Sequence, residues 1–196
     1  MSYLFQVADA LLAYNEGTTP DFLLVELRGG RLRVSVDDGS GSTAIYAPRN
    51  DTTHTRDLLD DDHWHLLELR QRGQKNFSIS VDDHDPETLV VPSHDDRRNV
   101  FDMFGPLYVA GLPAHLLQSR RPHGLQQADI NRFVGCLATL TVNGELDDGN
   151  ASLPPSAVTG CRSKQSVLLV TIRHTHGHTQ THIERTHLRH SLRSLD

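Results

Sequence analysis

The feature that most constrains the fold of this chain is a series of short apolar segments separated by turn residues. Residues 22–28 and 31–36 flank Gly29-Gly30, and two glycines between such segments predict a β-hairpin because both turn positions need a positive φ. Within residues 31–36 every second residue is apolar, so one face of this strand is expected to be buried and the other to face water.

Further segments of the same kind follow at regular intervals, whereas helical periodicity is confined to residues 8–14, too few for a stable helix. Many short strands at regular spacing predict an all-β antiparallel sandwich or barrel. Strands are expected at residues 64–70, 77–81, 88–91, 107–110 and 136–142.

The size and charge of the chain limit its class. Its 196 residues suffice for one domain of the larger sandwich type, and the net charge of -6 argues against nucleic acid as a partner. The most apolar stretch near the end, residues 167–172, is far too short to span a membrane, so no direct membrane insertion is expected. The N-terminus lacks the basic region and apolar core of a signal peptide.

The composition changes at residue 163, where the chain becomes rich in His, Thr and Arg. Such a biased segment is not expected to build a core. The sequence therefore predicts a domain over residues 1–162 and a disordered or loosely attached tail over residues 163–196.

Two observations bear on the cellular compartment. Cys136 and Cys161 are the two cysteines, and composition leaves open whether they are buried thiols or a disulfide of an oxidising compartment. Glycosylation sequons begin at Asn50, Asn76 and Asn150, which favours a secreted glycoprotein.

Four segments, in order, carry a shared pattern: residues 11–42, DHWH at 62–65, GPLYVAGLP at 105–113 and FVGCLATLTVNG at 133–144. Together they resemble the laminin G domain, also called the LNS domain of neurexins. One departure is Ala110, which stands where the family usually has the first of two glycines.

The resemblance implies a jelly-roll β-sandwich in which Cys136 and Cys161 form the terminal disulfide. It implies an extracellular or cell-surface domain of a larger secreted or membrane protein, of the kind that also carries EGF-like modules. Family members begin with one or two strands that precede this chain's first residues, so N-terminal strands are expected to be missing. The tail has no counterpart in the family.

The resemblance also implies a calcium site on one rim of the sandwich. Asp21 matches the first acidic ligand, a backbone oxygen near Asp37 or Asp38 matches a carbonyl ligand, and Asp129 and Asn131 match the second cluster. With so few side-chain ligands the site must add carbonyls and water, so weak binding is expected, with a Kd on the order of 10⁻⁴ to 10⁻³ M.

His63 and His65 flank Trp64 and have the spacing of an H-x-H metal pair on a strand. No third ligand is evident, so both histidines are expected to be structural. Trp64 is expected to anchor the core.

The expected function is binding or adhesion to a protein or glycan of the cell surface or matrix, with calcium at the rim. The first alternative is calcium-independent binding of sulfated glycans through the pairs Arg97-Arg98 and Arg120-Arg121.

A glycosidase is the second alternative, because some jelly-roll glycosidases carry a Glu-x-Asp-x-x-Glu strand. Glu145 begins that pattern here, but Asn150 stands at its end, so the pair of carboxylates that such enzymes need is missing. Residues 145–150 are also expected to be a loop. The chain is therefore not expected to be an enzyme.

Overall fold

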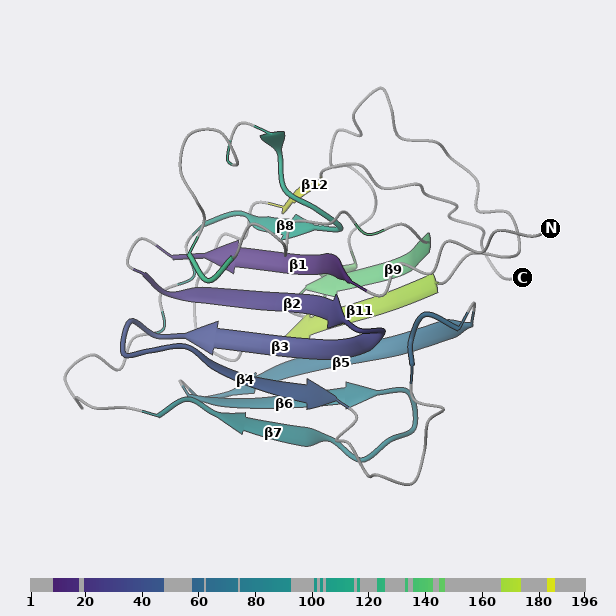
Figure 1. Ribbon diagram of the computed structural model, residues 1–196, viewed down its shortest axis with the longest axis horizontal. Helices are drawn as coiled ribbons and strands as arrows, with labels where there is room; N and C mark the ends of the chain where they lie inside the picture. Colours follow the sequence, from purple (N-terminus) through teal and green to yellow (C-terminus); the bar gives the residue numbers. More distant parts are fainter. Residues whose placement is uncertain are drawn as a thin grey trace.

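A computed structural model shows two facing β-sheets (Figure 1). It describes residues 9–17, 20–47, 58–61, 63–73, 75–92, 101, 103, 105–114, 116, 123–125, 133, 136–142, 145–146, 167–173 and 183–185. The strands of these residues are β1 (Ala10–Glu16), β2 (Phe22–Arg28), β3 (Arg31–Asp37), β4 (Thr43–Ala47), β5 (Trp64–Arg72), β6 (Asn76–Val81), β7 (Glu87–Val90), β8 (Leu107–Val109), β9 (Cys136–Val142), β10 (Glu145–Leu146), β11 (Val167–Arg173) and β12 (Ile183–Arg185).

Within the described part of the chain, each sheet has six strands. The first sheet has the order β12-β8-β1-β2-β3-β4, and the second has the order β10-β9-β11-β5-β6-β7. Most neighbours are antiparallel; the parallel pairs are those of β11 with β9 and β5, and of β12 with β8. The predicted antiparallel β-sandwich is therefore confirmed in its main features.

The β2–β3 hairpin forms as its two glycines predict. Gly29 and Gly30 both adopt positive φ, 58° and 73°, and Arg28 pairs with Arg31 across the turn. These angles suit the tight turns whose twist matches that of paired strands. Leu32, Val34 and Val36 are buried, as the alternation requires.

The main core fills the space between the two sheets. Alternate residues of both sheets point into it, and Phe77 meets Phe101 edge-to-face at 5.5 Å between ring centroids. Burying each large apolar side chain there contributes about 1.5–3 kcal/mol. A second cluster covers the outer face of the first sheet: Leu11, Tyr14, Phe22, Leu24, Tyr108, Leu112 and Leu125. Strands β1 and β2 are therefore covered on both faces, which explains their nearly continuous apolar sequences.

Three parts of the structure differ from expectation. Trp64 is 57% exposed, so the prediction that it anchors the core is wrong; the inner face of β5 carries Leu67 and Leu69 instead. Glu145 lies in β10, which pairs with β9, and not in a loop. Strands β11 and β12 fall within the segment predicted to be disordered or loosely attached.

Candidate functional site

The candidate site is the rim of the first sheet where β1 ends, β2 begins and β3 ends. Strand pairing brings these points together, because Phe22 is the partner of both Glu16 on β1 and Asp37 on β3. We call the rim formed by residues 16–17, 21–22 and 37–41 the β1–β2–β3 rim.

Asp21 is the buried carboxylate of this rim, with 2% of the residue exposed. Its carbonyl accepts a hydrogen bond from the Gly17 N–H at 2.9 Å, which closes the turn between β1 and β2. A Cβ added at Gly39 would lie 3.3 Å from Asp21 Oδ1, so the Asp21 side chain lies directly against the loop after β3. A buried carboxylate in contact with a loop at the end of paired strands is a suitable first ligand for a hard cation.

The loop after β3 is held by its own aspartates. Asp37 Oδ1 accepts hydrogen bonds from the N–H groups of Gly39, at 2.8 Å, and Gly41, at 3.1 Å. Asp38 Oδ1 accepts from the N–H of Ser40 at 3.1 Å, and the Ser40 hydroxyl lies within hydrogen-bonding distance of both Asp38 and the Pro92 carbonyl. These oxygens brace the loop, which leaves backbone carbonyls as the simplest further ligands there.

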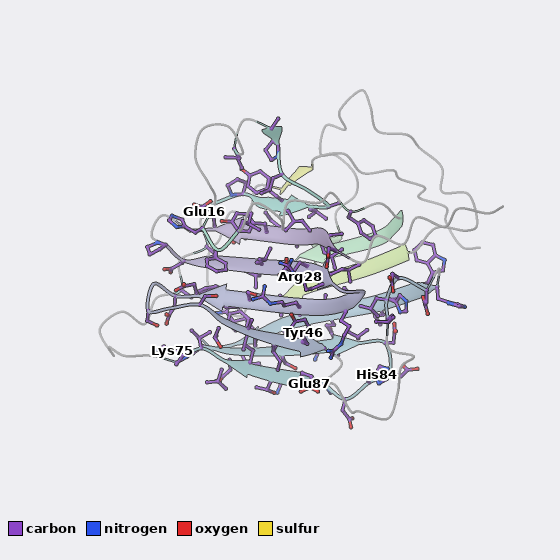
Figure 2. All side chains as sticks on the ribbon, in the orientation of Figure 1. Glu16, Arg28, Tyr46, Lys75, His84 and Glu87 are labelled. Carbon is purple, nitrogen blue, oxygen red and sulfur yellow. The ribbon has the colours of Figure 1, made fainter. Side chains whose placement is uncertain are left out.

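A second polar group, missed by the sequence reasoning, adjoins the rim at the end of β1 (Figure 2). Glu16 is 7% exposed, and its Oε1 lies 3.6 Å from Nε2 of His123. The Tyr14 hydroxyl lies 3.2 Å from Glu16 Oε2 and 2.9 Å from the His123 carbonyl. These contacts fasten the turn at residues 123–125 to the rim. This group could have been predicted from the polar residues that follow the apolar start of β1 in the sequence.

This geometry does not test the expected calcium ligands. Asp21 and Asp38 are both at the rim, whereas Asp129 and Asn131 lie outside the described residues. Within the described part of the chain, no three His, Cys, Asp or Glu residues are grouped to hold a metal ion. Among the described residues, the rim offers one buried carboxylate, Asp21, which lies against the loop after β3.

Most other predicted sites also lie outside the described residues. They are Asn50, Asn150, Cys161, the side chain of Cys136, and the pairs Arg97-Arg98 and Arg120-Arg121. Asn76 is described: it begins β6 and is exposed, so its side chain is accessible for glycosylation.

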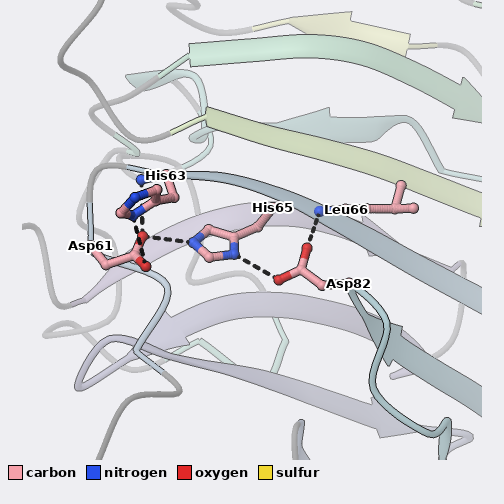
Figure 3. Close-up of polar contacts among 5 residues, drawn as sticks. All are labelled: Asp61, His63, His65, Leu66 and Asp82. Atoms are coloured by element: carbon pink, nitrogen blue, oxygen red, sulfur yellow. Dashed lines mark hydrogen bonds and ion pairs between the residues drawn. The ribbon is translucent and has the colours of Figure 1, made fainter.

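A separate polar cluster lies where β5 begins (Figure 3). His65 Nε2 is 2.9 Å from Asp61 Oδ1, and His65 Nδ1 is 2.9 Å from Asp82 Oδ2. Asp82, in the turn after β6, also accepts the Leu66 N–H at 2.7 Å and donates its own N–H to the Leu66 carbonyl at 2.8 Å. We call Asp61, His65 and Asp82 the His65 clasp.

The clasp shifts the ionisation of its members. Burial opposes the charged form of His65, but hydrogen bonds to Asp82 and Asp61 and their charges outweigh it and raise the pKa of His65 above 6.5. Burial alone would raise the pKa of Asp61, because it disfavours the charged carboxylate. The hydrogen bonds from His65 and from the His63 N–H outweigh this effect and lower the pKa of Asp61 below 3.8. His63 also contacts Asp61, with 3.1 Å between His63 Nδ1 and Asp61 Oδ2, so both histidines of the H-x-H pair contact carboxylates.

None of the helices among the described residues is long and apolar enough to cross a membrane.

Comparison with known proteins identifies a family. The profile of the laminin G domain matches residues 5–145. Neurexin 1 of Drosophila melanogaster is 29% identical over 150 residues, which cover 76% of this chain and 7% of that protein. Neurexin-2 of Mus musculus is 26% identical over 140 residues, which cover 71% of this chain and 7% of that protein. The chain thus spans a small part of the length of these relatives.

Two solved structures are also similar. Domains LG4-5 of the mouse laminin alpha1 chain give a TM-score of 0.47 at 20% identity, over 64% of this chain and 30% of that chain. The LG1-3 region of the laminin alpha2 chain gives a TM-score of 0.43 at 22% identity, over 65% of this chain and 23% of that chain.

Proposed function

The chain belongs to the laminin G domain family, and from this premise we propose that it is an extracellular binding and adhesion module that recognises a cell-surface or matrix ligand at the β1–β2–β3 rim. Laminin G domains are generally extracellular binding modules. The observation that carries the choice of this rim is Asp21, a buried carboxylate in contact with a loop that its own aspartates brace. Loops on a rigid scaffold are where binding residues usually lie.

Calcium is part of the proposal. Asp21 would hold it by its side chain, the loop at Asp37 and Asp38 by a backbone carbonyl, and Asp129 and Asn131 would complete the protein ligands. Calcium prefers six to eight oxygens, so about half of the shell would be carbonyls and water and the Kd would be about 10⁻⁴ to 10⁻³ M. Bound there, the ion would present positive charge to an acidic group of the partner.

The chain's own residues contribute preorganisation. The N–H groups of Gly39, Ser40 and Gly41 donate hydrogen bonds to the side chains of Asp37 and Asp38, which favours one conformation of the loop. A loop that is ordered before binding loses less conformational entropy when a partner arrives. The contacts of Glu16 with Tyr14 and His123 fix the adjoining turn in the same way.

Retention of the full chain on immobilised heparin tests the proposal against its main alternative. Calcium-dependent recognition predicts retention in calcium that is lost in chelator and in Asp21→Asn. The alternative, sulfated-glycan binding through Arg97-Arg98 and Arg120-Arg121, predicts retention that survives chelator and falls as salt rises. Asp83→Asn, an exposed aspartate away from the rim, is the matched control.

An extracellular role also implies an oxidising compartment. There Cys136 and Cys161 would form a disulfide, and Asn50, Asn76 and Asn150 would be open to glycosylation. Peptide mapping of the secreted chain, with and without reduction, tests both expectations. Separate peptides for Cys136 and Cys161 without reduction would exclude the disulfide.

A catalytic role has little support. Glu145 pairs with Val142 in the short strand β10, and Asn150 stands where a glycosidase of this pattern needs a second carboxylate. Glycoside turnover that Glu145→Gln abolishes would be required to revive this alternative.

A further inference from the structure

Strand β11 occupies an unusual place in the second sheet. It lies between β9 and β5 and runs parallel to both, whereas the other neighbouring pairs of this sheet among the described residues are antiparallel (Figure 1). A parallel strand needs a long crossover, unlike the tight turns that join the hairpins of this fold. β11 therefore enters the sheet as a separate piece of chain.

The position of β11 in the sequence also indicates that it is a separate piece of chain. The laminin G match ends at residue 145, and β11 runs from Val167 to Arg173. An interior strand of the sheet is thus supplied from beyond the matched domain. Its sequence, VLLVTIR, is rich in β-branched residues and carries its only charge at the last position, a composition typical of interior strands.

Without β11 the sheet would have a slot one strand wide. Strand β5 pairs with β11 from Trp64 to Arg70, and β9 pairs with it from Cys136 to Val142. Each of these strands would then present a row of unpaired N–H and C=O groups. Such a slot selects an extended peptide, held by main-chain hydrogen bonds on both sides.

We propose that the slot between β5 and β9 is a strand-acceptor site, which residues 167–173 fill as a separable strand. Its ligand class is an extended, apolar, β-branched peptide without proline, bound parallel to β5. A free peptide of residues 166–174 therefore binds the chain when its own β11 is disabled.

The test uses the full chain with Val170→Pro, because proline removes an N–H that an interior strand needs. Val170→Ile is the matched control, since it keeps the N–H and the β-branched side chain. We expect Val170→Pro to lower the Tm by on the order of 10 °C and to speed amide exchange in β5 and β9, with little change in Val170→Ile. Peptide 166–174 restores both properties of Val170→Pro in a saturable manner, and a scrambled peptide does not.

Two results would overturn the proposal. Equal melts and equal β5 exchange for the two variants would show that residues 167–173 do not fill the slot. If Val170→Pro is destabilised and the peptide does not restore its Tm and amide exchange, the strand is not separable. If Val170→Pro fails to fold, amide exchange of the wild-type chain provides the test. The proposal predicts that amides 167–173 are as protected as those of β5, and rapid exchange of amides 167–173 would contradict it.

Discussion

At the residue scale, the imidazole of His65 lies between the carboxylates of Asp61 and Asp82, with each ring nitrogen 2.9 Å from an oxygen. Both nitrogens donate hydrogen bonds only when the ring is protonated. The clasp is therefore complete when His65 is cationic and both aspartates are ionised. It joins the segment before β5 to the turn after β6, beside Trp64, the only tryptophan of the chain.

The clasp predicts a pH dependence of stability. The folded-state pKa of His65 is raised above 6.5, so its contribution is fully present below about pH 6.5 and is lost as pH rises through the folded pKa. The pKa of Asp61 is lowered below 3.8, so its contribution is present above that pH and is lost as pH falls through its folded pKa. Stability from the clasp should thus be greatest in mildly acidic solution.

Thermal melts from pH 5 to 9 check this, with Trp64 fluorescence as the local probe. Near pH 6, His65→Gln should lower the Tm by about 2–4 °C and remove the pH-dependent loss of stability above pH 6.5. His84→Gln, in the exposed turn after β6, is the control and should behave like the wild type. A pH profile that His65→Gln leaves unchanged would falsify the role of the clasp.

Gly124 gives a second prediction at this scale. Its φ is +75°, and an added Cβ would lie 2.2 Å from the Phe22 ring, next to the β1–β2–β3 rim. Gly124→Ala combines backbone strain with overpacking and should cost about 2–3 kcal/mol in urea unfolding. Gly73→Ala, with φ +69° and open space, isolates the strain and should cost about 1 kcal/mol. Equal costs would show that the turn does not pack on Phe22.

Some residue positions could be predicted from sequence and others could not. The position of Asp21 at the rim could be predicted because its motif is local, immediately before β2. The partners of His65 could not be predicted in this way, because only the pairing of β5 with β6 brings Asp82 near His65. The error at Trp64 has a similar cause: Trp64, Leu66, Leu67 and Leu69 are all apolar, so alternation alone could not decide which pair faces the core.

At the scale of the element, β6 shows the period-2 alternation most clearly. Phe77, Ile79 and Val81 are buried, while Ser78 and Ser80 face outward. Phe77→Ala should cost about 3–5 kcal/mol, because Phe77 is 2% exposed and packs against Phe101. Ser80→Ala on the same strand should change stability by about 0.5 kcal/mol or less. Chemical denaturation measures both, and similar losses would mean that the faces of β6 are misassigned.

Element order was predictable only where connections are short. The β2–β3 hairpin followed from Gly29 and Gly30, and strands β5 to β9 followed from the spacing of apolar segments, whereas that pattern predicted neither β1 nor β4. The place of β11 in the sheet could not be predicted from such patterns, because its parallel partners β5 and β9 are distant from it in the sequence and no tight turn joins β11 to either strand. Its apolar run was visible, but the His-rich composition around it argued for disorder.

At the scale of the whole molecule, two facing sheets place the rim loops on a scaffold whose core spans both sheets. The fold and family could be predicted because many local patterns agree in order along the chain. Binding specificity could not, since one fold carries many ligands. Asp21 and Asp38 lie at the rim, and the calcium proposal requires that Asp129 and Asn131 supply further ligands there.

The most direct measurement of that proposal is the thermal melt of the full chain, secreted under oxidising conditions, in about 10 mM calcium and in chelator. With a Kd of about 1 mM, calcium should stabilise the wild type by about 1.4 kcal/mol and raise its Tm by about 3–5 °C. Asp21→Asn should show no such rise, whereas Asp83→Asn should respond like the wild type. Equal melts with and without calcium in the wild type, or an undiminished rise in Asp21→Asn, would contradict a calcium site at this rim.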